Sequence, residues 1–153
     1  MQALLLQDWI TIRGDASAGV TSITQATDDW VDLAEFQDVV MWLEVKEVTH
    51  GGASTVNMTY ETGVSKDADM FRQCSDVTPV MGAGNVYVTV TVAATSTNLL
   101  SRWLRWTITA SGATSAWDAT FRIWLAVNYV GRSSTAAADQ AAADAYVPYG
   151  CDC

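Results

Sequence analysis

Apolar and polar side chains alternate with a period of two along much of this chain. In a β-strand successive side chains point to opposite faces, so such alternation is typical of strands with one buried face. Two segments show it most clearly, DVVMWLEVKEV (38–48) and NVYVTVTVA (85–93). The residues that would share one face of these strands are Val39, Met41, Leu43 and Val45 in the first, and Val86, Val88, Val90 and Val92 in the second.

The alternating segments are numerous enough to build two packed sheets. Further strands are predicted over LLLQDWITIRG (4–14), GVTSITQ (19–25), 56–61, 102–109 and 121–128, with DADMFRQ (67–73) as a strand or a single helical turn. Both prolines, Pro79 and Pro148, fall outside the strong strands. We therefore predict an all-β fold, a single antiparallel β-sandwich of jelly-roll or Ig-like type with about seven to eight strands.

The composition changes after residue 130. The alanines of STAAADQAAADAY (134–146) could support a short helix, but they offer no broad apolar stripe. A chain of 153 residues is also near the usual size of one domain. We predict a β-sandwich domain over residues 1–130 and an extended C-terminal arm or linker over 131–153.

Two glycine-containing loops separate strands that follow one another. THGGAS (49–54) stands between 38–48 and 56–61, and this pattern predicts a hairpin. ASGATSAWD (110–118) is predicted to connect 102–109 with 121–128. If these last two strands pair, Trp103, Arg105, Arg122 and Trp124 can lie together on the outer side of the sheet.

Residues 102–127 interleave three arginines with four tryptophans, and the whole chain has seven tryptophans. A single sandwich core seldom has room for so many. The alternation assigns Trp106 to the core and Trp42, Trp103 and Trp124 to the opposite face. Exposed aromatic clusters mark contact surfaces, although a loop or arm of the same chain could cover them, or a carbohydrate ring could stack on them. The predicted interaction residues are Trp42, Trp103, Arg105, Arg122 and Trp124.

The charge balance disfavours several partners. Seventeen acidic and eight basic residues give a net charge of −9, which repels a phosphate backbone, so no direct contact with nucleic acid is predicted. The start of the chain has no basic n-region, and no stretch approaches the ~20 apolar residues of a membrane span. We expect no signal peptide and no membrane partner. An acidic run is predicted to be a solvated loop or short helix face, with a cation or a basic partner as the alternative: Asp28, Asp29, Asp32, Glu35 and Asp38.

The sequence is poorly equipped for most catalysis. Its single histidine, His50, lies in the predicted glycine turn and is expected to be exposed to solvent. Nucleophile-elbow, phosphate-loop and zinc-protease motifs are all missing from the sequence. We predict that the protein is not an enzyme. A glycosidase, which needs only two carboxylates, is an alternative.

Metal ligands are equally sparse. A structural zinc needs four ligands, and only His50 and Cys74 could supplement the terminal pair Cys151 and Cys153. A free thiol, or a disulfide to a neighbouring subunit, is the favoured role for that pair. Asp67 and Asp69 could offer oxygen ligands to calcium, but such spacing is common in loops. No cofactor and no metal site is predicted.

The strand pairs DVVMWLEVKEVT and LLSRWLRWTITASGATSAWDATFRIWLAVN, in a small acidic chain rich in Thr, Ala and Val, resemble the β-sandwich virion proteins of tailed bacteriophages. That group includes capsid decoration proteins and minor head or head-to-tail components. The resemblance covers roughly residues 30–130 as a pattern, without a diagnostic motif, and the GCDC terminus departs from it.

This resemblance implies a non-enzymatic structural protein. Such a protein would be made in the host cytoplasm and located in the virion. It would stabilise the particle as a homo-oligomer that binds a capsid or other virion protein. The alternative is a carbohydrate-binding β-sandwich module that uses the exposed tryptophans.

Overall fold

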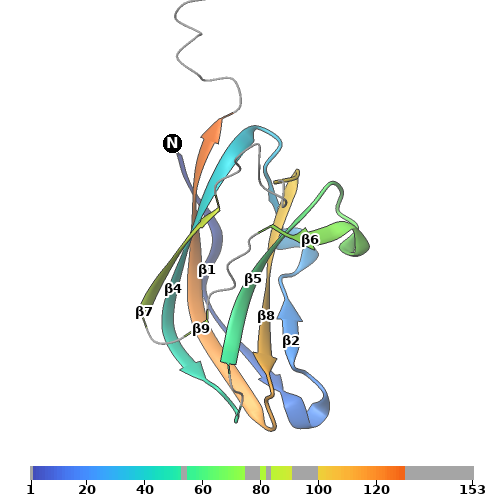
Figure 1. Cartoon of the computed structure of the whole chain (residues 1–153), viewed down its shortest axis with the longest axis vertical. Coiled ribbons are helices and arrows are strands. Elements are labelled where there is room, and N and C mark those ends of the chain that lie inside the picture. The colour runs from blue at the N-terminus through green and yellow to red at the C-terminus, as the bar shows by residue number, and fades with distance from the viewer. Residues whose placement is uncertain (1, 53–54, 75–79, 82–83, 91–99, 130–153) are drawn as a thin grey trace, which may run out of the picture.

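The computed structural model describes residues 2–52, 55–74, 80–81, 84–90 and 100–129, which form two antiparallel β-sheets packed face to face (Figure 1). The four-stranded sheet has the order β1 (Gln2–Asp15), β9 (Ala116–Tyr129), β4 (Phe36–Thr49) and β7 (Gly84–Val90). The five-stranded sheet has the order β2 (Ser22–Thr24), β8 (Trp103–Ser111), β5 (Thr55–Gly63) and β6 (Phe71–Gln73), with β3 (Val31–Asp32) also paired to β8. The predicted all-β sandwich is confirmed.

The strands pair as nested partners. The first strand pairs with the last, β1 with β9. In the stretch of sequence between them, β4 pairs with β7, and β5 pairs with β6. Strands β2 and β3 pair with separate parts of β8, so together they occupy one strand position. Eight strand positions in two sheets with this nested order form a jelly roll. Of the two sandwich types that the alternation allowed, this is the one adopted.

The inner faces of the two sheets meet in one apolar core. Every second residue is almost fully buried over 39–45 of β4, 56–62 of β5, 104–110 of β8 and 117–127 of β9, as the alternation predicts. Each large apolar side chain buried in this way contributes about 1.5–3 kcal/mol. The predicted valine face of residues 86–92 falls outside the described side chains. The core positions of the four central strands are Val39, Met41, Leu43, Val45, Val56, Met58, Tyr60, Leu104, Trp106, Ile108, Ala110, Trp117, Ala119, Phe121, Ile123, Leu125 and Val127.

The smaller predicted elements are found near their expected positions. Strand β1 covers the N-terminal segment and β2 falls within 19–25. Segment 67–73 combines both predicted forms, a 3₁₀ turn η3 (Ala68–Met70) followed by β6. The acidic run begins with another 3₁₀ turn, η2 (Thr27–Asp29), which has no buried residues. The predicted arm over 131–153 lies outside the described residues.

The predicted hairpin over residues 38–61 is wrong. Strand β4 pairs with β7 and β9, whereas β5 pairs with β6 and β8, so the chain crosses from one sheet to the other at the glycine loop. The chain crosses again between β8 and β9, which belong to different sheets. A glycine turn between two amphipathic strands is compatible with a crossing between sheets as well as with a hairpin. The packing of the two sheets decides which strand each of them pairs with.

The two crossings contact each other at one end of the sandwich. The carbonyl of Gly51 accepts the backbone N–H groups of Thr114 and Ser115, both at 3.1 Å. Gly51 has a φ of +56°, and a Cβ there would lie 2.4 Å from the carbonyl oxygen of Ala116. Glycine is therefore required at this position by both the backbone conformation and the close approach of the second loop.

Substitution of Gly51 tests this arrangement. Gly51→Ala combines the left-handed backbone cost of about 1–2 kcal/mol with overpacking of about 1–3 kcal/mol. The control is Gly19→Ala, because Gly19 has a φ of +82° but nothing within 4 Å of its added Cβ. We expect urea unfolding to show a clearly larger loss of unfolding free energy for Gly51→Ala. Equal losses would mean that the close approach of the second loop adds no cost to a side chain at position 51.

Candidate interaction surface on the four-stranded sheet

The outer face of the four-stranded sheet carries an exposed apolar row. Leu5 of β1 lies opposite Trp124 of β9, and Trp124 lies opposite Trp42 of β4. Directly opposed side chains on one sheet face lie side by side. Leu5 is 41% exposed and Trp42 is 42% exposed. The row therefore offers large apolar side chains to solvent across three neighbouring strands.

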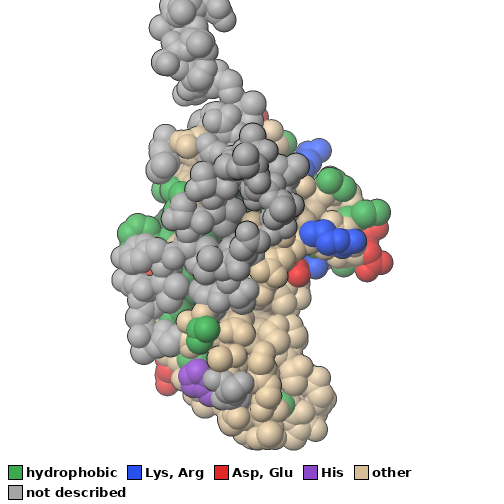
Figure 2. Space-filling model, in the orientation of Figure 1, with side chains coloured by type: hydrophobic (Ala, Val, Ile, Leu, Met, Phe, Trp, Pro, Cys, Tyr) green, Lys and Arg blue, Asp and Glu red, His purple; other side chains and the backbone are tan. Residues whose placement is uncertain are grey.

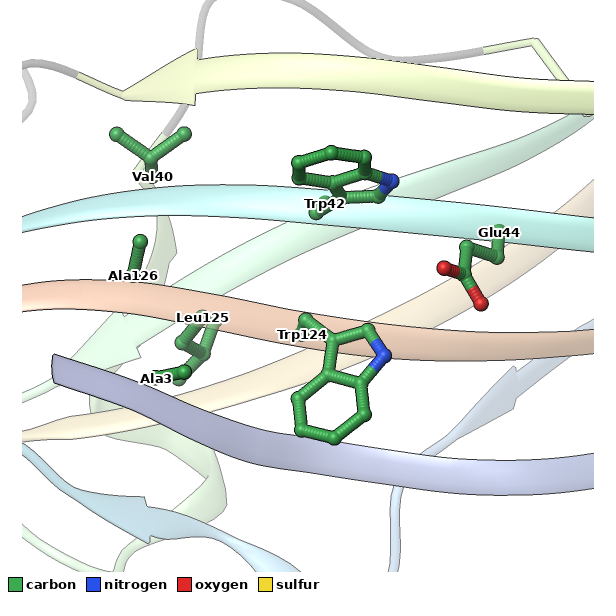
Figure 3. A pocket seen from close by; sticks show the side chains of 7 residues that line it. All are labelled: Ala3, Val40, Trp42, Glu44, Trp124, Leu125 and Ala126. Carbon is green, nitrogen blue, oxygen red and sulfur yellow. The ribbon is translucent and has the colours of Figure 1, made fainter.

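A shallow groove of about 320 Å³ crosses this row and follows the direction of the strands between β4 and β9. The indole rings of Trp42 and Trp124 stand on neighbouring strands, with the Glu44 carboxylate toward one end and small side chains toward the other (Figure 3). The small end arises because Ala3, Ala126 and Val40 lie opposite one another in the next row of the sheet. We call this feature the indole groove; it is lined by Ala3, Val40, Trp42, Glu44, Trp124, Leu125 and Ala126.

Arg122 borders the indole groove and is held between two aromatic rings. Its Nε donates to Glu44 Oε2 at 2.8 Å, and its Nη2 donates to the same oxygen. The guanidinium carbon lies 4.9 Å from the ring centre of Trp9 and 5.2 Å from that of Trp124. A guanidinium over an indole is stabilising, by about 0.5–1 kcal/mol at an exposed site. The ion pair thus holds the guanidinium against both rings.

Irregular pairing of β1 brings Trp9 to this surface. The register with β9 shifts between Leu5 and Gln7 and again between Gln7 and Ile10. Gln7 turns toward the core, where its Oε1 accepts the indole N–H of Trp106 at 3.2 Å. Trp9 is 45% exposed and lies against Arg122. Leu5, Trp9 and Glu44 were not among the predicted interaction residues, because a simple alternation does not reveal a bulge or the partner strand.

The predicted cluster of four Arg and Trp side chains does not form. Because β8 and β9 lie in different sheets, Trp103 and Arg105 face outward from the five-stranded sheet, and Arg122 and Trp124 face outward from the other. The prediction required β8 and β9 to pair with each other. The loop between them instead crosses from one sheet to the other, so the two strands are not neighbours. Trp42, Arg122 and Trp124 are the predicted residues that the structure does bring together.

Arg105 has a partner arrangement like that of Arg122, but it is enclosed by its own chain. Its Nε donates to Glu61 Oε2 at 2.7 Å, and its guanidinium lies 4.0 Å from the ring centre of Phe71 and 5.1 Å from that of Trp30. Arg105 is 9% exposed and Trp30 is 7% exposed. The sequence left open that the same chain covers some of the outward aromatic and arginine side chains. At the cluster around Arg105 this is what the structure shows. An interaction role for Arg105 stays a prediction.

Trp103 lies nearby on the same outer face and is half-buried. Lys66 Nζ lies 4.5 Å from its ring centre, and the guanidinium of Arg102 lies 5.3 Å from it. Arg102 also forms an ion pair with Asp32, to which it donates through Nε and Nη2. The hydrogen bonds from Arg102 lower the pKa of the Asp32 carboxyl group. The ring is thus flanked by cations and differs from the apolar row on the other sheet.

The groups that could perform chemistry are dispersed. His50, the single histidine, lies exposed at the surface as predicted (Figure 2). Asp67 caps η3 by accepting the backbone N–H of Asp69 at 3.2 Å, which gives the Asp67 side chain a structural role. Burial raises the pKa of the Cys74 thiol to about 12, so the thiol is neutral and a poor nucleophile at ordinary pH. Cys151 and Cys153 lie outside the described residues.

The described residues hold neither a cluster of metal ligands nor a membrane-spanning helix. No three of their His, Cys, Asp and Glu side chains lie close enough together to bind a metal ion. None of the helical turns in this part of the chain has the length and apolar character needed to cross a membrane.

Comparison with known proteins gives only distant likenesses. No protein-family model matches the chain, and no curated protein matches it. A structure of infectious bursal disease virus strain Gx has 12% identity and a TM-score of 0.45 over 86% of this chain and 32% of that one. The VP2 subviral particle of the same virus has 13% identity and a TM-score of 0.45 over 88% of this chain and 34% of that one.

The chain therefore spans about a third of the length of each of these two viral chains. Likenesses this distant carry no argument about function.

A double-mutant cycle measures the ion pair at the groove. We expect Arg122→Gln and Glu44→Gln to be coupled by about 1 kcal/mol in unfolding free energy, because both side chains are half-buried and directly opposed. The comparison cycle uses Arg102→Gln and Asp32→Asn, a more exposed pair whose coupling should be smaller and should weaken further in salt. Additive losses at Arg122 and Glu44 would show that the pair does not stabilise this face.

Proposed function

We propose that this protein is a non-enzymatic structural subunit of a virus particle that assembles through the outer face of its four-stranded sheet. The observation that carries the proposal is the indole groove, where Trp42 and Trp124 stand together on a face that the described chain leaves exposed. Contiguous exposed apolar patches on soluble proteins mark contact sites. The partners would be further copies of the chain and a capsid or other virion protein.

The composition of this face suits a stable protein interface. Each tryptophan that becomes buried removes about 150–250 Å² from water, and tryptophan and arginine are the residues most enriched among binding hot spots. Trp42, Trp124 and Leu5 supply the apolar centre, and the Arg122–Glu44 pair supplies a polar border. This arrangement follows the usual anatomy of an interface, an apolar core with a polar rim.

The charge of the groove also favours contact between like chains. The whole chain carries −9, which opposes self-association. Among the groove-lining residues only Glu44 is charged, and Arg122 neutralises it. Two strongly acidic subunits could therefore meet at the groove with its single carboxylate neutralised in each subunit.

The jelly roll and the sequence resemblance add general support. Jelly rolls are used by viral capsid proteins and by lectins, so the architecture is compatible with either role but decides neither. The strand patterns that resemble tailed-phage virion proteins favour the particle, as a capsid decoration or minor head component. Location in the virion after synthesis in the host cytoplasm belongs to the same proposal.

Truncation of the groove tryptophans tests the assembly. We expect Trp42→Ala and Trp124→Ala each to weaken self-association by about 2 kcal/mol or more, roughly 30-fold in dissociation constant. Native mass measured by light scattering over a concentration series reports this change, while urea unfolding checks that the fold is retained. Trp103→Ala, on the opposite sheet, is the matched control and should assemble as the unmodified protein does. A monomer at all concentrations, or equal effects of the three variants, would refute the proposal.

A carbohydrate site is the second candidate because the groove places two indole faces beside a carboxylate. Sugar rings stack on aromatic side chains, and a few polar groups orient a ligand in its pocket. A glycan array probed with the unmodified protein and with Trp124→Ala separates the two functions. The assembly proposal expects no specific retention. Retention by a monomeric protein that is lost in Trp124→Ala would replace assembly with sugar binding.

A further inference from the structure

The indole groove has the length of a short extended peptide. Most of its lining side chains lie in three successive rows of the outer face, those of Glu44, Trp124 and Ala126 (Figure 3). Residues that share one face of a strand are two positions apart, which is about 6.7 Å. Three rows therefore extend over about 13 Å, the length of about four residues of extended chain.

The chemistry of the groove suits an apolar occupant without charge. The ring of Trp124 forms one side, and the small side chains of Ala3 and Ala126 leave room beside it. Among the lining residues only Glu44 is charged, and Arg122 neutralises it. Aromatic rings pack favourably against an indole in offset or edge-on arrangements. A short extended segment that carries aromatic side chains would fill this space.

The sequence beyond β9 contains one segment with these properties. Strand β9 ends at Tyr129, and residues 130–153 follow it. The two aromatic side chains of this stretch stand at the ends of Tyr146–Tyr149, which reads YVPY. No charged residue lies between Asp144 and Asp152, so the segment can approach an acidic protein without repulsion of its own.

We propose that the segment Tyr146–Tyr149 docks in the indole groove of its own chain. Proline-containing extended segments commonly bind in grooves lined by aromatic side chains. Four residues at about 3.1 Å each span about 12 Å, which matches the length of the groove. The docked segment would pack its rings against Trp124 and over the small side chains of the neighbouring row.

The composition of the segment favours an extended conformation. Proline fixes its own φ at about −65° and disfavours helical backbone at the residue before it, so Pro148 restricts both itself and Val147. In a polyproline helix three residues complete one turn, so Tyr146 and Tyr149 would lie on the same side. Tyrosine has only two side-chain torsions, which keeps the entropy cost of ordering it low. Both features reduce the free energy needed to order the segment on binding.

The length of the intervening chain favours the groove of the same copy. Trp124 lies five positions before Tyr129, about 17 Å along β9. The 16 residues 130–145 would cover about 24 Å even as a continuous helix and about 50 Å when extended, so the groove is within reach in either conformation. A tethered segment has an effective concentration on the order of 1 mM, far above that of a second copy in dilute solution.

Docking of this segment would regulate assembly. It would cover the surface through which the subunits are proposed to meet, so subunits would have to displace it. This consequence rests on the proposed function, whereas the docking itself rests on the groove and the segment alone.

Disulfide cross-linking in the full chain tests the docking. Cys151 lies two residues beyond the segment and serves as the probe, in a background with Cys153→Ser. Cys74 is kept because it is buried. A second cysteine is placed singly at each end of the groove, because the segment can run in either direction. The two variants are Ala3→Cys, an exposed lining residue, and Thr120→Cys, one row beyond Arg122 on β9.

Serine substitutions in the segment separate docking from mere tethering. At about 1 µM protein we expect a cross-link to Cys151 within one chain, at one of the two ends. It should form about tenfold more slowly when Tyr146→Ser and Tyr149→Ser are combined, because the tether is unchanged and only the docking is lost. The matched control combines Ala137→Ser and Ala141→Ser and should leave the rate unchanged. Equal rates with and without the tyrosines would overturn the docking.

Substitutions in the protein body test the groove side of the contact. Trp124→Ala should slow the cross-link as much as loss of the tyrosines does, and Trp103→Ala on the opposite sheet should not. Equal effects of Trp124→Ala and Trp103→Ala would contradict a site in the groove. A further mixture contains one chain with Cys151 alone and one chain with the groove cysteine alone. A cross-link between these chains as fast as that within one chain would overturn docking in the same copy.

The native mass of the assembly distinguishes this proposal from the proposed function. If both hold, the variant with Tyr146→Ser and Tyr149→Ser assembles at a lower protein concentration than the unmodified protein, and weaker assembly would overturn the regulatory role. If the cross-link depends on the tyrosines but Trp42→Ala leaves the native mass unchanged, the docking stands and the proposed function is wrong. If Trp42→Ala weakens assembly but the cross-link ignores the tyrosines, the docking is wrong and the proposed function stands.

Discussion

The structure depends on β9 being hydrogen-bonded along both of its edges. With β1 on one side and β4 on the other, the strand cannot change its register or reverse its faces without breaking two sets of hydrogen bonds. Its inward residues supply much of the core, and its outward residues Arg122 and Trp124 are placed beside Glu44 and Trp42 by the same pairing. The core and the candidate interaction surface are therefore two consequences of one constraint.

The interleaving of arginine and tryptophan has a common physical explanation in both sheets. Each arginine forms a cross-strand ion pair, Arg105 with Glu61 and Arg122 with Glu44, and each lies against aromatic rings. The two arginines differ in what surrounds them. Arg105 is covered by Trp30 and Phe71 from its own chain, whereas Arg122 borders an exposed groove. The same local chemistry lies within the covered fold at one site and beside the candidate contact surface at the other.

Sequence reasoning identified the strands but not the partners of the strands. The burial of Leu104, Trp106 and Ile108 follows from alternation alone. The hairpin over 38–61 failed because loop composition does not distinguish a turn within a sheet from a crossing between sheets. Trp9 was not assigned to the site because two register shifts in β1 bring it beside Arg122, and such bulges leave no clear trace in an alternating pattern.

The sequence by itself determined the class of fold, the two-faced strands and the surplus of tryptophan, because these depend on local periodicity and composition. Only the tertiary structure decided which outward side chains became neighbours. Neighbours across a sheet come from segments far apart in the chain, and the nested pairing of the jelly roll places Trp42 beside Trp124 while it separates Trp103 from both. That pairing is selected by the burial of all the inner faces together, a condition that no single segment contains.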